Sequence, residues 1–183
     1  MASPSSTATA ASKTQVELDD AKDAFIAQWG AMGSAWGINR TMAQIHALLM
    51  ASPEPLDTDS VMEELRISRG NANTNLRELV GWGLVRRMTR RGERREFFEA
   101  EKDVWKMFCI IVRERKRREI EPALETLRDC LQRTQGLRSR EAQSFHQVMA
   151  DLEEFVALAD NTMEKISRSD RSKVIPWVLK TMG

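Results

Sequence analysis

"SRGNANTNLRELVGWGLVRR", residues 68–87, decides the fold. Ala72, Leu76, Leu79 and Val80 recur at helical spacing and predict a helix with one apolar stripe. Ser68 suits the N-cap of this helix, and the glycines of "GWG" suit its end. Asparagines stand at 71, 73 and 75 although Asn is a middling helix former. We place Asn71 opposite the apolar stripe and Asn73 and Asn75 on its flanks.

The flanking segments place this helix within a larger motif. Upstream, "ASPEPLDTDS" ends a helix predicted over 34–50, because Pro53 and Pro55 cannot continue it. A short helix follows over 58–65, with Thr58 as its N-cap and with Val61, Met62 and Leu65 buried, and "RIS" then forms a tight turn. Downstream, "LVRRMTRRGERREFFEA" reads as strand, turn and strand, with Gly92 in the turn. A helix-turn-helix followed by a basic hairpin is a winged helix.

The polar face of the helix at 69–80 and the hairpin tip offer groups that suit DNA. Asn can pair with adenine N6 and N7, Arg can pair with guanine O6 and N7, and Gly70 removes bulk where a recognition helix approaches the groove. An arginine-rich wing suits the minor groove, where A·T-rich tracts concentrate negative potential. The candidate DNA-binding residues are Ser68, Arg69, Gly70, Asn71, Asn73, Thr74 and Arg77 in the helix, and Arg90, Arg91, Arg94 and Arg95 in the wing. Solvated polar surface is the competing interpretation; charge on both helix and wing favours DNA.

The charge of the chain is concentrated in one block. The net charge is only +1, but residues 66–95 carry nine arginines against two glutamates, whereas residues 1–65 carry three basic against nine acidic residues. All the cations of the basic block are Arg, which suits bidentate contact with phosphate and guanine.

The whole chain is predicted to be mainly α-helical with a small β-hairpin wing. We expect a disordered tail over 1–14, an N-terminal dimerisation helix over 15–33, the winged helix-turn-helix over 34–101 and a helical dimerisation region over 102–183. Gly30 and Gly33 are expected to loosen the chain after the first helix. In the last region, Pro122 interrupts a helical pattern over 103–133, and a long amphipathic helix over 139–167 suggests an antiparallel hairpin or a dimer interface. The apolar end "VIPWVLKTMG" is expected to pack on a partner subunit.

Several classes of function are disfavoured. We find no phosphate-binding glycine loop, no metal-ligand spacing, no nucleophile motif and no apolar run near the ~18 residues of a membrane span, so no catalytic residue, metal or cofactor is assigned. The N-terminus does not read as a secretory signal, and we expect a cytoplasmic protein. Cys109 and Cys130 are expected about 30 Å apart along one helix, too far to bridge, and most simply as unreactive thiols; a thiol switch would need one of them exposed with a lowered pKa.

Three motifs taken together carry a family resemblance. They are "WGINR…AQIHALL", "SRGN…NLREL…WGLV" and "RRGERR…F". Over about residues 33–133 the chain resembles the MarR-type winged-helix transcriptional regulators, and within them the GbsR branch. The resemblance implies a homodimer with interlocking N- and C-terminal helices that binds double-stranded DNA at a pseudo-palindromic operator, with its two recognition helices roughly 34 Å apart, as a repressor.

The resemblance also implies a small-molecule effector, since some members of that branch respond to choline or glycine betaine. A quaternary ammonium ion would bind in an aromatic cage, for which the candidates are Phe25, Trp29, Trp36, Trp105 and Phe108. Aromatic residues at helical spacing are more often part of the core. Two other functions remain open: a winged helix that binds protein without reading DNA sequence, and a thiol-switched regulator.

Overall fold

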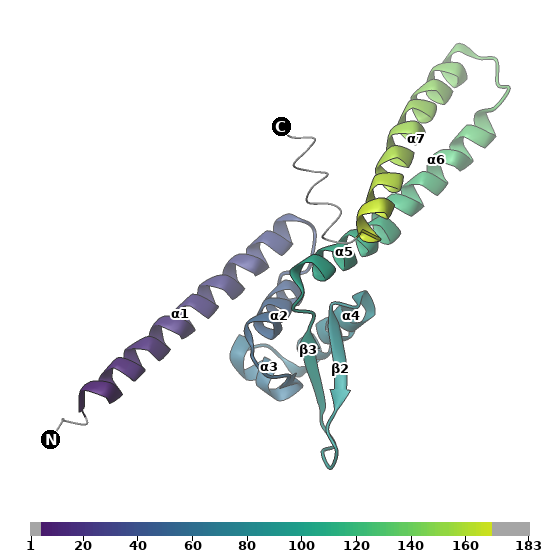
Figure 1. Cartoon of the computed structure of the whole chain (residues 1–183). Helices are drawn as coiled ribbons and strands as arrows, with labels where there is room; N and C mark the ends of the chain where they lie inside the picture. Colours follow the sequence, from purple (N-terminus) through teal and green to yellow (C-terminus); the bar gives the residue numbers. More distant parts are fainter. Residues whose placement is uncertain (1–4, 170–183) are drawn as a thin grey trace. The chain divides into compact units, whose positions relative to one another are not determined.

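The computed structural model describes residues 5–169, which form two compact units that meet between Lys102 and Asp103. The fold is mainly helical with one small antiparallel sheet, which confirms the predicted fold class (Figure 1). The first unit contains α1 (Ser5–Ala35), α2 (Arg40–Ala51), β1 (Leu56–Asp57), α3 (Thr58–Leu65), α4 (Arg69–Trp82), β2 (Val85–Thr89) and β3 (Glu96–Ala100). No helix among the described residues is both long and apolar enough to span a membrane.

The core of the first unit lies where α2, α3 and α4 meet the sheet. Its fully buried large side chains are Met42, Ile45, Leu49, Val61, Leu76 and Leu79. On α4, Ala72, Leu76 and Leu79 are buried as the stripe predicted, whereas Val80 is only half-buried. On α3 only Val61 is buried; Met62 and Leu65, which were expected to join it, are half-buried.

Helix α1 differs from its prediction at both ends. Residues 5–14, expected within a disordered tail, belong to the helix, and residues 1–4 lie outside the described part. At the other end α1 continues through Gly30 and Gly33 to Ala35, and α2 begins only at Arg40, where the Asn39 side chain accepts a hydrogen bond from the Met42 N–H at 3.1 Å. The chain reverses around Gly37, whose φ of 77° favours glycine.

Gly30 and Gly33 are contact points between α1 and α2 rather than breaks. A Cβ on Gly33 would lie 2.6 Å from the Cβ of Ala43, and one on Gly30 would lie 2.6 Å from Cγ of Gln44. The missing side chains let the two helix backbones approach closely. A helix-breaking glycine and a packing glycine look the same in sequence, which is why the prediction was wrong here.

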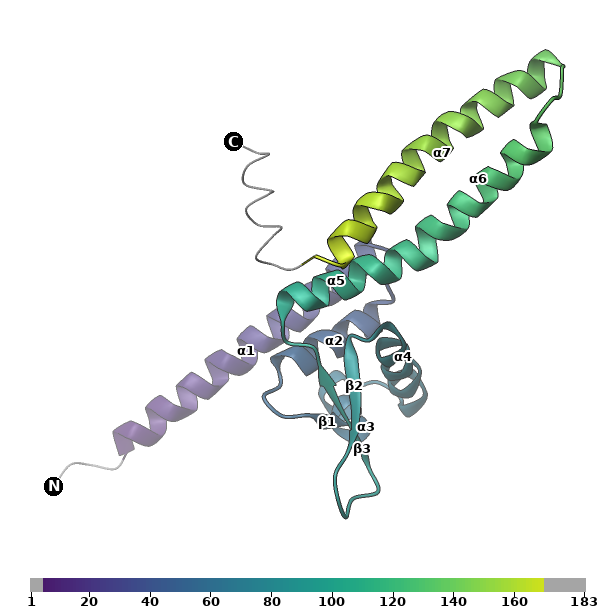
Figure 2. The ribbon, with the colours of Figure 1, turned by 45° about the vertical axis from the view of Figure 1, so that its right-hand side comes forward.

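The second unit is an antiparallel helical hairpin. It contains α5 (Val104–Arg115), a π-helical turn (Lys116–Ile120), α6 (Glu121–Thr134) and α7 (Arg140–Ser167), and α6 and α7 run side by side in both ribbon views (Figure 2). The interruption expected at Pro122 is present, since the π-turn directly precedes the helix that Pro122 helps to begin. The segment 174–183, expected to pack on a partner, lies outside the described residues.

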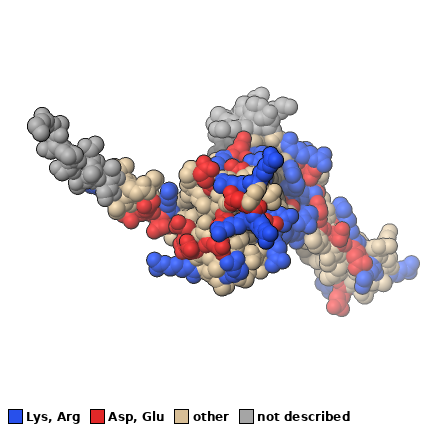
Figure 3. Space-filling view, turned by 90° about the horizontal axis from the view of Figure 1, so that it is seen from below, with Lys and Arg blue, Asp and Glu red and all other residues tan. Residues whose placement is uncertain are grey.

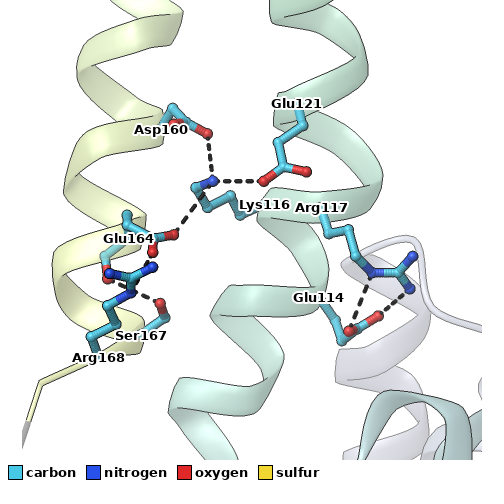
Figure 4. A network of polar contacts seen from close by, with 8 residues as sticks. All are labelled: Glu114, Lys116, Arg117, Glu121, Asp160, Glu164, Ser167 and Arg168. Carbon is cyan, nitrogen blue, oxygen red and sulfur yellow. Dashed lines mark hydrogen bonds and ion pairs between the residues drawn. The ribbon is translucent and has the colours of Figure 1, made fainter.

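A buried lysine joins the π-turn to α7. The Lys116 side chain is 11% exposed, and its Nζ lies 2.6 Å from Oε1 of Glu121, 3.1 Å from Oδ1 of Asp160 and 3.4 Å from Oε2 of Glu164 (Figure 4). The hydrogen bond to Glu121, followed by that to Asp160, raises the pKa of Lys116 above its ordinary value. One ammonium group thus joins carboxylates from the start of α6 and from the last turns of α7.

The contact at Gly33 gives a stability prediction. We expect Gly33→Ala to lower the free energy of unfolding by about 1–2 kcal/mol, because the cost of overpacking against Ala43 exceeds the gain in helix propensity. Gly81→Ala is the matched control: Gly81 lies in α4 with nothing within 4 Å of the added Cβ, so that variant should be more stable by about 0.5–1 kcal/mol. Urea denaturation of both variants measures the difference, and equal stabilisation would contradict the close-packing role.

Candidate nucleic-acid interface

Two capped helices form the helix-turn-helix. The cap of α3 is Asp57 rather than the predicted Thr58: Oδ1 of Asp57 accepts hydrogen bonds from the backbone N–H and the hydroxyl of Ser60, both at 2.8 Å. Helix α3 ends at Leu65, and the C-cap residue Arg66, with a positive φ of 52°, turns the chain. Helix α4 then begins after Ser68, whose hydroxyl accepts a hydrogen bond from the Asn71 N–H at 3.3 Å. Ser68 is therefore a helix cap, as the sequence predicted.

One face of α4 exposes most of the predicted recognition residues. Arg69, Gly70, Asn71, Thr74 and Arg77 are exposed, and Asn73 is half-buried. Arg69 forms an ion pair with Asp59 of α3, and Nε of Arg77 donates a hydrogen bond to the backbone oxygen of Asn73 at 3.2 Å. The face combines an exposed amide, a hydroxyl and guanidinium groups, the side chains that hydrogen-bond to base edges and phosphates.

Asn75 behaves differently from the other two asparagines. It is buried, at 4% exposure, although its position beside the apolar stripe had suggested only a flanking place. Its Nδ2 donates hydrogen bonds to the backbone oxygen of Asn71 at 2.8 Å and to Oδ1 of Asn71 at 2.7 Å. The signal in the sequence was the spacing of four residues between the two asparagines, which places them on neighbouring turns of one helix.

The wing is the hairpin of β2 and β3. Val85 pairs with Ala100 and Thr89 with Glu96, and β1 adds to the other edge of β3 by pairing Leu56 with Phe98. Gly92, with φ 87°, occupies the left-handed position of the connecting turn. Phe97 and Phe98 are buried, so β3 anchors the hairpin to the core while residues 90–95 form its exposed tip.

The arginines of the wing differ in their contacts. Arg86 and Arg87 form cross-strand ion pairs with Glu99 at 3.0 Å and Glu96 at 3.1 Å. Arg90 lies over the ring of Phe97, 4.3 Å from its centroid. Arg91 and Arg94, at the tip, have no ion pair or hydrogen bond with any residue in the described part of the chain. Seen from below, basic and acidic side chains are intermixed over the surface (Figure 3).

Arg95, a predicted wing contact, is bound within the protein. Its Nη1 donates a hydrogen bond to Oδ2 of Asp57 at 2.8 Å, and the Asp57 side chain is only 9% exposed. The backbone hydrogen bond from Ser60, followed by the one from Arg95, lowers the pKa of Asp57 to about 2. The same contact raises the pKa of Arg95. Arg95 therefore fixes the base of the hairpin tip to the start of α3.

Four of the five aromatic residues predicted for a ligand cage form two separate pairs. In the first unit the ring centroids of Phe25 and Trp29 are 5.5 Å apart, and in the second unit those of Trp105 and Phe108 are also 5.5 Å apart. Trp36 is 61% exposed. Trp105 has a structural contact as well, since its Nε1 donates a hydrogen bond to the backbone oxygen of Ser169 at 3.1 Å.

His46 lies beside the first aromatic pair. Its ring centroid is 6.2 Å from that of Trp29, and burial lowers the pKa of His46 to about 4, so the ring is neutral at pH 7. Among the described residues, no cluster of His, Cys, Asp and Glu could hold a metal ion. Cys109 is buried, and burial raises the pKa of its thiol, which is the opposite of what a thiol switch needs. Cys130 is half-buried.

Comparisons with known proteins agree with the fold. The HTH-type transcriptional repressor GbsR of Bacillus subtilis (strain 168) is 26% identical over 104 residues, which make up 57% of this chain and 57% of that protein. A solved structure described as that of a transcriptional regulator superimposes with a TM-score of 0.54 and 22% identity, and covers 79% of this chain and 98% of that one. No family model matches the chain.

The resemblance to GbsR-type regulators is confirmed. The solved structure establishes the fold, and the sequence match extends over little more than half the length of the curated relative. Both similar proteins are described as transcriptional regulators, a class that is not enzymatic.

Asp57 gives a prediction of pH-dependent stability. Its pKa in the folded chain, about 2, lies below its ordinary value of 3.8, so its stabilising effect is present above about pH 4 and is lost as the pH falls towards 2. Asp57→Asn keeps a capping oxygen and removes the charge, so we expect the free energy of unfolding at pH 7 to fall by about 2 kcal/mol.

Urea denaturation at pH 7, 4 and 3 measures this effect. The difference between Asp57→Asn and the unsubstituted chain should shrink as the pH is lowered. Asp59→Asn is the control, because it removes an exposed partner of Arg69 and should cost less than about 1 kcal/mol. A loss for Asp57→Asn that is the same at every pH would contradict the role of its charge.

Proposed function

We propose that the chain is a sequence-specific DNA-binding transcription regulator, a homodimeric repressor that binds a pseudo-palindromic operator in the cytoplasm. The observation that carries the proposal is that two features occur in one unit. The helix α4 has an exposed polar face, and the hairpin tip has arginines with no ion pair or hydrogen bond within the described chain. A helix-turn-helix places such a face in the major groove, and a wing reaches the neighbouring groove or backbone. Similarity to a transcriptional repressor supports the same conclusion.

The proposal gives each candidate residue a contact. Arg69, Asn71, Asn73, Thr74 and Arg77 would contact bases or nearby phosphates in the major groove, with Ser68 and Gly70 shaping the start of the helix. Arg91 and Arg94 would reach the minor groove. Arg90 contacts Phe97 of the hairpin and Arg95 binds Asp57 at the start of α3, so in this proposal both support the tip rather than read DNA.

The dimer is supported by an apolar face that the hairpin leaves open. Phe145, Val148, Leu152 and Phe155 recur at spacings of three and four along α7, and all four are exposed, Phe155 to 70%. An apolar stripe of this length on a helix suits pairing with a second helix. We assign that partner to a second copy of the chain.

Two further predictions remain open. A small cation such as choline or glycine betaine could relieve repression, for which the aromatic pair Phe25–Trp29 beside neutral His46 is the more enclosed candidate. A winged helix that binds protein without reading DNA sequence is the alternative. The buried state of Cys109 counts against a thiol switch at that residue.

The wing is tested by the salt dependence of DNA binding. Fluorescence anisotropy with the DNA upstream of the protein's own gene, against scrambled DNA, should show tighter binding to the former. Arg94→Ala should weaken both and reduce the slope of log K against log salt by roughly 0.9 for each lost phosphate contact. Arg86→Ala, which removes an arginine paired with Glu99, is the control and should leave the slope unchanged. Equal slopes for Arg94→Ala and the unsubstituted chain would count against the wing.

The dimer is tested by charge placed within the apolar stripe. Phe155→Glu should raise the dimer dissociation constant at least about 30-fold, because a carboxylate would be buried without a partner. Gln143→Glu adds the same charge at an exposed polar position of α7 and should have little effect. Sedimentation equilibrium gives both constants. A chain that is monomeric at micromolar concentration, or a Phe155→Glu variant that dimerises normally, would refute the interface.

A further inference from the structure

The contact between Asn75 and Asn71 fixes which end of the Asn71 amide faces outward. Nδ2 of Asn75 donates to the backbone oxygen of Asn71, which can only accept a hydrogen bond. The amide of Asn75 therefore cannot be turned the other way without placing two oxygens against each other. The same Nδ2 lies 2.7 Å from the Asn71 side chain, so the group facing it there must be the oxygen Oδ1.

Burial makes this arrangement stable. Asn75 is 4% exposed and lies among the buried residues of α4, where its amino group must be satisfied by the protein. Asn71 is exposed on the face that carries Thr74 and Arg77. Its oxygen is held towards Asn75, so the amino group Nδ2 is the part of its amide that remains for an external partner.

We propose that Asn75 is a positioning residue that makes Asn71 a hydrogen-bond donor towards DNA, so that Asn71 selects guanine over adenine. The inference rests on the proposed function. Bidentate pairing of Asn with adenine needs Oδ1 to accept from N6 while Nδ2 donates to N7. With Oδ1 turned towards Asn75 and one of its two lone pairs occupied, the end of the amide that faces outward is Nδ2 with its two N–H donors. Guanine presents two acceptors, N7 and O6, on its major-groove edge.

This orientation distinguishes Asn71 from an asparagine of a recognition helix that pairs with adenine. An unsupported Asn rotates freely and can present either end of its amide, whereas a held one presents a single type of group. Asn75 contributes to specificity from inside the core, without touching DNA.

Selection of bound sequences from a random-sequence DNA pool tests the proposal, with the full chain and with Asn71→Ala, Asn75→Leu and the double variant. Leu suits the buried site beside Leu76 and Leu79 and removes both donated hydrogen bonds. The base pair whose preference falls most in Asn71→Ala is the one that Asn71 reads. We expect guanine there, with Asn75→Leu reducing the preference for guanine over adenine roughly tenfold.

The double variant separates positioning from a general structural role. If Asn75 acts through Asn71, adding Asn75→Leu to Asn71→Ala should change the preference at that base pair no further. A further loss of similar size in both backgrounds would overturn the proposal. Adenine at that position, or uniform weakening by Asn71→Ala with no position affected, would also overturn it while leaving sequence-specific binding intact. Failure of the unsubstituted chain to enrich any sequence would refute the proposed function, and this inference with it.

Asn71→Asp provides a second test that does not disturb the core. The exposed carboxylate can still accept from Asn75 but has no donor to offer, and an acidic residue in the first turn of a helix is favourable. We expect the preference at that base pair to move from guanine towards cytosine, whose N4 is a donor. Retention of guanine would overturn the proposal even if Asn75→Leu does not fold.

Discussion

The Asp57 carboxylate joins the parts of the first unit that a winged helix must hold together. One oxygen caps α3 through Ser60, and the other binds Arg95 at the base of the hairpin tip. Its backbone belongs to β1, which pairs with β3 opposite Phe97. A single buried charge thus sets the start of the first helix of the motif, the edge of the sheet and the base of the wing. Because a buried carboxylate is costly unless it is hydrogen-bonded, the site is stable only when all these contacts form together.

Local sequence patterns correctly predicted those elements that depend on neighbouring residues alone. The stripe of α4, its cap at Ser68 and the turn at Gly92 follow from helical spacing, capping chemistry and positive φ, and all three are present. The predictions were wrong where a contact with a distant part of the chain determines the local structure. Thr58 and Asp57 both suit an N-cap, and Asp57 takes the place because its carboxylate binds both Ser60 and Arg95, which lies 38 residues away in the sequence. Gly33 packs against Ala43 of the next helix, a contact that no pattern within α1 reveals.

The arginine-rich composition of residues 66–95 overstates the charge available to a partner. Five of these arginines have carboxylate partners within the protein: Arg69, Arg86, Arg87, Arg90 and Arg95. These pairs are mostly exposed and individually weak, so their main effect is to orient side chains and to reduce the net field of the wing. Within the wing, the arginines without a carboxylate partner among the described residues are Arg91 and Arg94. A wing built in this way presents its positive potential at one small tip, where a narrow groove can accept it, rather than over the whole hairpin.

The three asparagines of α4 have different roles although they alternate in sequence. Asn71 is exposed, Asn73 is half-buried and receives Arg77 on its backbone oxygen, and Asn75 is buried. A leucine at 75 would bury more apolar surface and favour the helix more, so the amide at this position costs stability. The cost is limited because both of its hydrogen bonds are made within the helix, one turn away. A buried amide whose two bonds both end on Asn71 restrains one exposed residue, and that residue lies on the face of α4 that carries Arg77 and Thr74.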